Sequence, residues 1–348
     1  MERQRVVVVG AGVYGASVAA ALVRRGAAVT VVDAGTPAGG TSGATFSWTN
    51  ASGKRPRAYH DLNVAGMAAH RELAARTPGN DWYHETGNLE WADGDATRAA
   101  LRRKVEDVIG YGYEARWLTR AETLRLEPGL AGLPPDGIAY FPREGWIDPV
   151  RLVAHLLAGI DVVAGDRVTG IDVDGVSAVR AVRLASGRRL AADAVVDGAG
   201  PRAADVAALV GLDLPMRNTR GILVVTTPVP AAAPRRVIHA PHIHLRPESG
   251  GRLLLHSTDT DDPAAVLAAA ATLLPDVETT IQEVRVGERP IPADGLPVLG
   301  RVAAVPGFHL AVSHSGATLC LHAGGLVAAE VTGDDQSAAL APYRYERF

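Results

Sequence analysis

The chain has 348 residues, 47% of them hydrophobic, and a formal net charge of −3 at pH 7. This length allows one long domain or two intertwined ones, and the charge gives no reason to expect nucleic acid or an anionic membrane as a partner. Because Cys320 is the only cysteine, intrachain disulfides and cysteine-rich metal sites are excluded. We expect a cytoplasmic protein, since there is no signal peptide and no apolar run long enough to span a bilayer.

The stretch over residues 5–35 predicts a dinucleotide-binding unit. A run of valines is typical of a buried parallel strand, and a small-residue helix and a second strand follow before Asp33. Glycines with GxGxxG spacing lie between strand and helix, at Gly10, Gly12 and Gly15. They permit a tight turn, close approach to a pyrophosphate, and packing of helix on strand. Asp33 can accept ribose hydroxyls, and its charge would repel the extra phosphate of NADP.

The segment after Asp33 is rich in Gly, Ser and Thr and is too long for a simple connection. Loops of this kind are usually functional. Its hydroxyls and amides suit a second contact with a diphosphate, and Trp48 and Asn50 could face a ring system. A mobile lid that contacts nothing is the alternative interpretation.

The rest of the chain alternates helical and strand patterns. Helices are predicted over 58–75, 97–109, 120–126, 263–274 and up to Val331, with another beginning at Asp148-Pro149. Strands are predicted over 83–91, 220–227, 239–246, 251–258, 284–287 and 308–312. Residues 161–196 are interpreted as a β-meander that ends in a second strand–glycine–helix element, and 289–300 as a proline-rich turn.

Six segments occur in an order that identifies a family: the opening fingerprint, TSGATFSWTNA, YFPREGWIDPVRL, VVDGAGPRAADVAAL, GERPIPADGLPVLG and AVSHSGATLC. With these motifs the chain resembles the FAD-dependent oxidoreductases of the D-amino-acid oxidase superfamily, the group containing glycine oxidase and sarcosine oxidase. The resemblance implies an α/β fold in which a doubly wound, Rossmann-like FAD-binding domain is interwoven with a mixed, mainly antiparallel β-sheet substrate domain. The expected segments are 1–80, 138–215 and 290–348 for the FAD domain, and 81–137 and 216–289 for the substrate domain.

The resemblance also implies where FAD binds. The corresponding residues are Gly10, Gly12, Val13, Tyr14, Gly15, Asp33, Ala34, Thr41, Ser42, Val168, Ala199, Gly200, Gly316, Ala317 and Thr318. Some relatives tether the flavin through a cysteine or histidine at the places that hold Gly287 and Asn50 here, so non-covalent FAD is expected.

Arg289, in the GERP motif, matches the arginine with which glycine oxidase and D-amino-acid oxidase grip the substrate carboxylate. The planar guanidinium fork suits a carboxylate, although a surface ion pair is the alternative in this arginine-rich chain. Trp48, Asn50 and His244 are predicted pocket walls. Where sarcosine-oxidase-like members carry an oxygen-activating lysine, the strand GGRLLLHST offers leucines and His256. Slow reoxidation by oxygen is therefore expected, with Lys54 as the substitute cation and His256 or His314 as the next candidates.

Several histidines cluster in sequence, at His239, His242, His244 and His256, with His242 and His244 on one face of a predicted strand. No cysteine or nearby carboxylate completes a metal site, so no metal is expected. His60, His70 and His155 fall in predicted helices and are interpreted as structural.

The predicted reaction is oxidation of the carbon–nitrogen bond of a small amino acid or amine by hydride transfer to flavin N5, followed by hydrolysis of the imine. Molecular oxygen or another electron acceptor would reoxidise the flavin. Two alternatives stay open on the sequence: an NAD-dependent dehydrogenase, and a flavin-binding scaffold protein without turnover.

Overall fold

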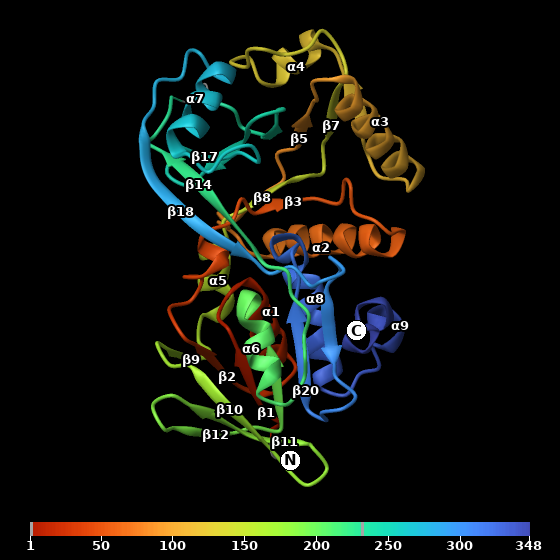
Figure 1. Cartoon of the computed structure of the whole chain (residues 1–348), viewed down its shortest axis with the longest axis vertical. Helices are drawn as coiled ribbons and strands as arrows, with labels where there is room; N and C mark the ends of the chain where they lie inside the picture. The colour runs from red at the N-terminus through yellow and green to blue at the C-terminus, as the bar shows by residue number, and fades with distance from the viewer. Residues whose placement is uncertain (1–2, 231–232) are drawn as a thin grey trace.

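The computed structural model describes residues 3–230 and 233–348, and it has two halves, each built on one large sheet (Figure 1). The lower half holds a six-stranded sheet in which every strand is parallel to its neighbours except the edge strand β19. In spatial order its strands are β19 (Val298–Arg301), β20 (Phe308–Val312), β13 (Ala194–Asp197), β1 (Arg5–Val9), β2 (Ala28–Asp33) and β9 (Asp161–Ala164).

Both faces of this sheet are covered, which explains the unbroken valine run of β1. Val6 and Val8 point to one face, and Val7 and Val9 to the other, because side chains alternate along a strand. The helices on the first face are α1 (Val13–Arg24), α5 (Pro149–Leu157) and α8 (Gly316–Val331). The second face carries α6 (Ala203–Ala208) and the three-stranded meander of β10 (Val168–Val173), β11 (Val179–Leu184) and β12 (Arg189–Ala191).

The upper half holds an eight-stranded, mainly antiparallel sheet. Its strands, in spatial order, are β18 (Ile281–Arg289), β14 (Thr219–Thr226), β17 (Arg252–His256), β16 (His244–Glu248), β15 (Val237–His239), β5 (Asn88–Glu90), β7 (Ile138–Phe141) and β6 (Arg116–Leu118). The helices of this half are α3 (Asp95–Gly110), α4 (Arg120–Leu126) and α7 (Pro263–Leu273).

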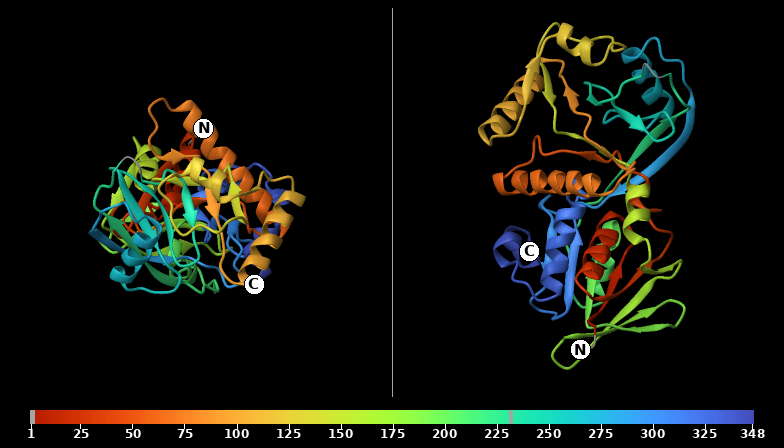
Figure 2. Two further views of the ribbon diagram at one scale, coloured as in Figure 1. Left: turned by 90° about the horizontal axis from the view of Figure 1, so that it is seen from above. Right: turned by 180° about the vertical axis from the view of Figure 1, so that it is seen from behind.

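The two halves meet along α2 (Arg57–Arg76) and a small sheet of β3 (Trp48–Thr49), β8 (Gly145–Ile147) and β4 (Tyr83–His84) (Figures 1 and 2). The long strand β18 runs from the upper half down to this junction. The chain ends in α9 (Ser337–Leu340) and two 3-10 turns, Ala341–Tyr343 and Tyr345–Arg347. Of the helices described, none combines the length and the apolar character that crossing a bilayer requires.

The expected fold class is therefore confirmed, and most predicted elements lie within a few residues of their observed bounds. The prediction of one strand over residues 83–91 is wrong. β4 and β5 belong to different sheets, and the extended conformation is interrupted at Gly87, whose φ is +86°. Residues 239–246 form a hairpin of β15 and β16 rather than one strand, so His242 lies in its exposed turn, away from His244.

Four further segments differ from the sequence prediction. Only the middle of residues 161–196 is a meander, because β9 and β13 join the parallel sheet. The predicted strand over 284–287 extends along the whole of β18, and the turn over 289–300 already contains the start of β19. Strand β7 lies in the eight-stranded sheet, although its residues fall in a segment assigned to the FAD domain on the sequence.

Candidate active site

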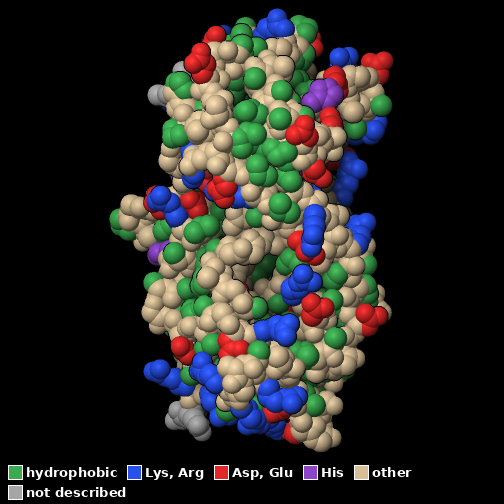
Figure 3. Space-filling model, turned by 60° about the vertical axis from the view of Figure 1, so that its left-hand side comes forward, with side chains coloured by type: hydrophobic (Ala, Val, Ile, Leu, Met, Phe, Trp, Pro, Cys, Tyr) green, Lys and Arg blue, Asp and Glu red, His purple; other side chains and the backbone are tan. Residues whose placement is uncertain are grey.

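A cavity of about 1020 Å³ opens at the carboxyl ends of the parallel strands, the edge at which doubly wound sheets bind ligands. Figure 3 shows a hollow near the middle of the molecule, with Lys and Arg side chains beside it. The cavity is lined by the β1–α1 turn, the end of β2, residues 38–45, the start of β10, the turn after β13, the end of β18 and the loop that enters α8.

Close packing around the β1–α1 turn requires its three glycines. A Cβ atom on Gly10 would lie 2.5 Å from the carbonyl oxygen of Gly198, and one on Gly15 would lie 1.7 Å from that of Gly10. A Cβ atom on Gly12 would lie 2.9 Å from Ser42 Oγ. Helix α1 has no side-chain cap and no acidic residue in its first turn. Its N-terminal N–H groups and positive dipole end can therefore serve an anionic ligand.

Asp33 lies across from this turn, at the end of β2. Its Oδ2 accepts a hydrogen bond from the Ala11 N–H at 2.6 Å, and its Oδ1 accepts one from the Gly35 N–H at 2.7 Å. Val168 lines the cavity beside it. The carboxylate is thus held in one orientation at the cavity wall, as a ribose-binding acid requires.

The other end of the cavity is formed by the loop into α8. His314, Gly316 and Ala317 line it, and α8 has no side-chain N-cap. Behind the loop, Ser315 Oγ bonds Lys54 Nζ at 3.0 Å and the Tyr59 hydroxyl at 2.7 Å. Burial lowers the pKa of His314 to about 4, with the positive charge of Lys54 adding to the effect.

The same burial lowers the pKa of Lys54 to about 8, although the carboxylate of Glu144 opposes the shift. Lys54 therefore loses its proton far closer to neutral pH than an exposed lysine does.

All but two of the predicted FAD contacts line this one cavity: Gly10, Gly12, Val13, Tyr14, Asp33, Ala34, Thr41, Ser42, Val168, Ala199, Gly200, Gly316 and Ala317. Gly15 and Thr318 lie behind it. Gly15 packs under the glycine turn, whereas the buried hydroxyl of Thr318 accepts a hydrogen bond from the Asn50 N–H at 3.2 Å. The cavity fits FAD, whose diphosphate would lie at the N-terminus of α1, where the Val13 N–H donates to Ser42 Oγ at 3.1 Å.

The predicted substrate residues lie outside the lining of this cavity. Arg289 and His244 belong to the eight-stranded sheet, whereas Trp48 lies in β3 and Asn50 directly follows it. His239, His244 and His256 occupy directly opposed positions on β15, β16 and β17. Their ring centroids are 4.4 Å and 5.7 Å apart, and we call them the histidine row. Arg289 Nη2 donates to His256 Nε2 at 2.8 Å. The row was not predicted, because it depends on strand register rather than on sequence spacing.

The histidine row is neutral at neutral pH. Burial lowers the pKa of His244 and of His256 to about 4, and that of His239 well below its usual range. A guanidinium can only donate, so His256 Nε2 is an acceptor and the ring hydrogen lies on Nδ1. Within the described residues no group of His, Cys, Asp or Glu is arranged to hold a metal ion.

A buried carboxylate, Glu144, holds two side chains, Trp48 and Asn88, that contact His239 of the row. It accepts hydrogen bonds from Trp48 Nε1 and Asn88 Nδ2, both at 3.1 Å, and from the Ser52 N–H at 2.9 Å. Burial raises the pKa of Glu144, and the charge of Lys104 opposes this. Asn88 Oδ1 in turn accepts from His239 Nδ1 at 2.8 Å. Glu144 lies within the motif YFPREGWIDPVRL, but the sequence alone indicated no role for it.

The remaining predicted residues have simple environments. Asn50 Nδ2 donates to the Trp48 carbonyl at 3.2 Å, while its buried Oδ1 has no partner among the described atoms. His60 and His70 bond backbone carbonyls, and His155 stacks on Trp82.

Comparisons with known proteins agree with this site. A model of the family "FAD dependent oxidoreductase" matches residues 5–331. Glycine oxidase of Geobacillus kaustophilus is 29% identical over 99% of this chain and 97% of its own, and its crystal structure superposes with a TM-score of 0.88 over 99% of both chains. Iminodiacetate oxidase from Chelativorans is 25% identical over 98% of both chains, with a TM-score of 0.81. L-Amino acid deaminase from Proteus vulgaris, 20% identical, shares the fold with a TM-score of 0.89 over 100% of this chain and 95% of that one. From its cavity, its fold and the family match over nearly its whole length, this chain belongs to the FAD-dependent oxidoreductase family and is an enzyme that uses FAD.

Proposed function

We propose that the enzyme oxidises the carbon–nitrogen bond of a small amino acid to an imine, which water then hydrolyses. The observation that carries this proposal is the position of Arg289. Its strand neighbours Glu288 and Pro290 line the cofactor cavity, while its guanidinium turns to His256 on the sheet face. No carboxylate of the described residues forms an ion pair with Arg289. A partly buried guanidinium without an anion is suited to a carboxylate from the substrate.

The residues around Arg289 would orient such a substrate. His256 accepts from one guanidinium nitrogen and so fixes the fork. His244, which has no hydrogen bond within the described part of the chain, and Trp48 would form walls. The neutral imidazoles add no positive charge that would repel the substrate amine. FAD bound in the cavity would supply the hydride acceptor. The protein would contribute orientation, exclusion of water and the positive end of α8.

The family assignment excludes the two alternative functions that the sequence left open, an NAD-dependent dehydrogenase and a flavin-binding scaffold protein without turnover. The named relatives that act on glycine, iminodiacetate and L-amino acids support an amino-acid substrate.

We further propose that FAD is held without a covalent bond. A Cβ atom on Gly287, one of the two usual linkage places, would lie 2.1 Å from the carbonyl oxygen of Ala44, so a cysteine there would displace the loop. Acid precipitation of the yellow protein should leave the flavin in the supernatant. Colour that stays with the pellet would contradict this proposal.

The substrate class is tested by anaerobic bleaching of the flavin with glycine, N-methyl amino acids, cyclic imino acids, D- and L-amino acids, and the matching amines without a carboxylate. We expect bleaching by members of the carboxylate-bearing set and none by the simple amines. Equal bleaching by the amines would refute the assignment of Arg289. Failure of the whole panel, with dithionite still reducing the flavin, would refute amino-acid oxidation.

A further inference from the structure

The corner at residues 45–47 joins the cofactor cavity to the histidine row. Thr45 lines the cavity. The ring of the next residue, Phe46, lies 5.8 Å from the His239 ring, 6.4 Å from that of His244 and 6.3 Å from that of His256. Phe46 therefore stands between the place proposed for the flavin and the place proposed for the substrate.

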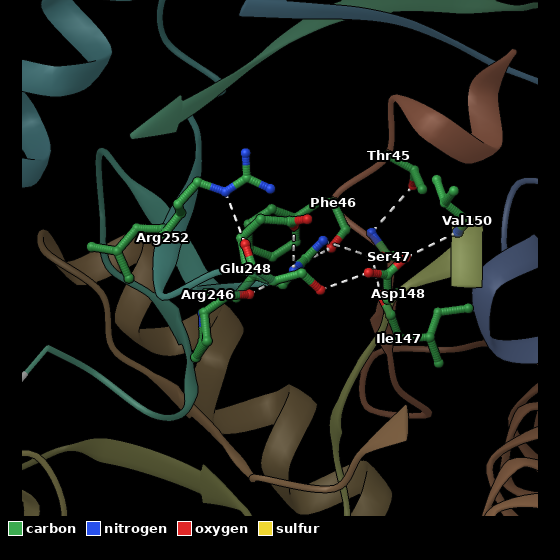
Figure 4. A network of polar contacts seen from close by, with 12 residues as sticks. Thr45, Phe46, Ser47, Ile147, Asp148, Val150, Arg246, Glu248 and Arg252 are labelled. Carbon is green, nitrogen blue, oxygen red and sulfur yellow. Dashed lines mark hydrogen bonds and ion pairs between the residues drawn. The ribbon is translucent and has the colours of Figure 1, made fainter. Parts of the chain in front are cut away.

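One buried side chain holds this corner. Arg246, on β16 and 1% exposed, donates from Nε to the Phe46 carbonyl at 2.6 Å and from Nη2 to Ser47 Oγ at 2.9 Å (Figure 4). Its guanidinium also pairs with Glu248 at 2.9 Å and lies over the Trp146 ring at 4.6 Å. The charge is thus compensated inside the protein, and none of it is directed to a ligand.

The backbone conformation of residues 45–47 requires stabilising contacts such as those from Arg246. Ser47 has a φ of +48°, a region that side chains other than glycine rarely occupy without surrounding contacts that impose it. Its Oγ donates to the Ile147 carbonyl at 2.7 Å, and its carbonyl accepts from the Ile147 N–H at 3.1 Å. With Arg246 on the other side, Ser47 is fixed from two strands that are distant in sequence.

We propose that Arg246 is a positioning residue for substrate selection: it fixes Phe46 over the histidine row, and the ring limits the size of the side chain that the active site accepts. This inference rests on the proposed amino-acid substrate. The carboxylate would lie at Arg289 and the reacting carbon near the flavin, so the side chain of the substrate has to pass Phe46. Arg246 itself touches neither substrate nor cofactor.

The positioning half of the inference is tested without turnover. Hydrogen–deuterium exchange of the holoenzyme should show faster exchange over residues 44–49 in Arg246→Met, by about tenfold or more. The matched control is Arg252→Met on the neighbouring strand, whose Nε bonds only the Ser249 carbonyl at 2.8 Å; it should leave the segment unchanged. Equal exchange in both variants would overturn the positioning role.

The selection half is tested by a double-mutant cycle on anaerobic bleaching with glycine, alanine and phenylalanine, each of the chiral pair as D and L forms. Phe46→Ala and Arg246→Met should each raise the phenylalanine-to-alanine rate ratio by about tenfold to a hundredfold. In the Phe46→Ala background Arg246→Met should change the ratio no further, because Arg246 acts through Phe46. Unchanged ratios, or additive effects, would overturn the inference.

Two outcomes separate this inference from the proposed function. If no amino acid of the panel bleaches the wild-type flavin, amino-acid oxidation fails, and substrate selection by Phe46 fails with it. If the wild type is bleached but the ratio does not respond to Phe46→Ala, only the present inference fails. Should Arg246→Met not fold, Phe46→Ala removes no buried charge and tests selection alone, and Ser47→Ala, which deletes one Arg246 contact, tests positioning.

Discussion

The cofactor cavity and the histidine row are built in opposite ways. The cavity is lined by turns and helix ends such as the β1–α1 turn, whose close contacts with neighbouring backbone require glycine at Gly10 and Gly15. The row consists of side chains from separate strands, brought together by the register His239↔His244↔His256. A site made of backbone depends on short stretches of sequence, whereas a site made of side chains depends on how distant strands pair. Single substitutions should therefore impair either the cofactor cavity or the histidine row without impairing the other.

The largest effect is expected from Gly15→Ala, which disrupts the β1–α1 turn of the cofactor cavity. The added methyl group would lie 1.7 Å from the Gly10 carbonyl oxygen and 2.8 Å from its carbon, so the turn has to move. Ordinary overpacking costs about 1–3 kcal/mol, and a clash this close with backbone should cost considerably more, so the protein should be recovered without flavin or not at all. Gly325→Ala, where a Cβ atom meets nothing within 4 Å, is the control. Normal flavin content in Gly15→Ala would show that the turn tolerates displacement.

Arg289→Lys should impair only the substrate region beside the histidine row. Lysine keeps the charge but cannot donate two parallel hydrogen bonds, so amino-acid binding should weaken by about 2–5 kcal/mol while flavin content stays normal. Titration of the flavin spectrum and steady-state KM values measure this. Arg285→Lys, on the same strand and paired with Glu283 at 2.9 Å, is the matched control. Intact amino-acid binding would return Arg289 to a structural role.

Asp33→Ala should have a smaller effect, confined to the cofactor. It removes the acid that faces the cavity and also leaves the Ala11 and Gly35 N–H groups without their partner. Loss of charged hydrogen bonds of this type costs roughly 1.5–3 kcal/mol. FAD affinity, measured by fluorescence quenching on reconstitution, should fall accordingly. Asp161→Ala, on the adjacent β9, is the control. An unchanged FAD affinity in Asp33→Ala would contradict the proposed role of Asp33 in binding the ribose.

The smallest effect is expected from Lys54→Met, on the reaction of the reduced enzyme with oxygen. Because burial lowers the pKa of Lys54 to about 8, its charge is present below that pH and is lost above it. If this charge assists reoxidation, the rate should fall as pH rises through about 8, and Lys54→Met should be about fivefold slower at low pH and insensitive to this change.

Stopped-flow mixing with oxygen measures this rate. The control is Arg57→Met, which removes an exposed cation paired with Asp61 at 3.0 Å. Fast reoxidation that survives Lys54→Met would make His256 and His314 the next candidates, although burial lowers the pKa of each to about 4 and they would act as neutral imidazoles. It would also contradict the expectation that this enzyme reoxidises slowly.

The sequence by itself determined the local parts of this protein. The valine run, the glycine spacing and Asp33 specify the strand–turn–helix unit, because each is a constraint between residues that lie close together in the chain. The loop into α8 and the second glycine turn after β13 were predictable for the same reason. These motifs, in order, also sufficed to indicate the family.

Only the tertiary structure decided what surrounds the substrate. Arg289 was predictable from its motif, but its partner His256 lies across two strand boundaries, on β17. Glu144 lies in a family motif and Arg246 in none, but the role of both comes from burial among groups that are distant in sequence. The turn at His242 also changed which histidines face one another. The reason is physical: strand pairing and register depend on the packing of a whole sheet, which no short stretch of sequence contains.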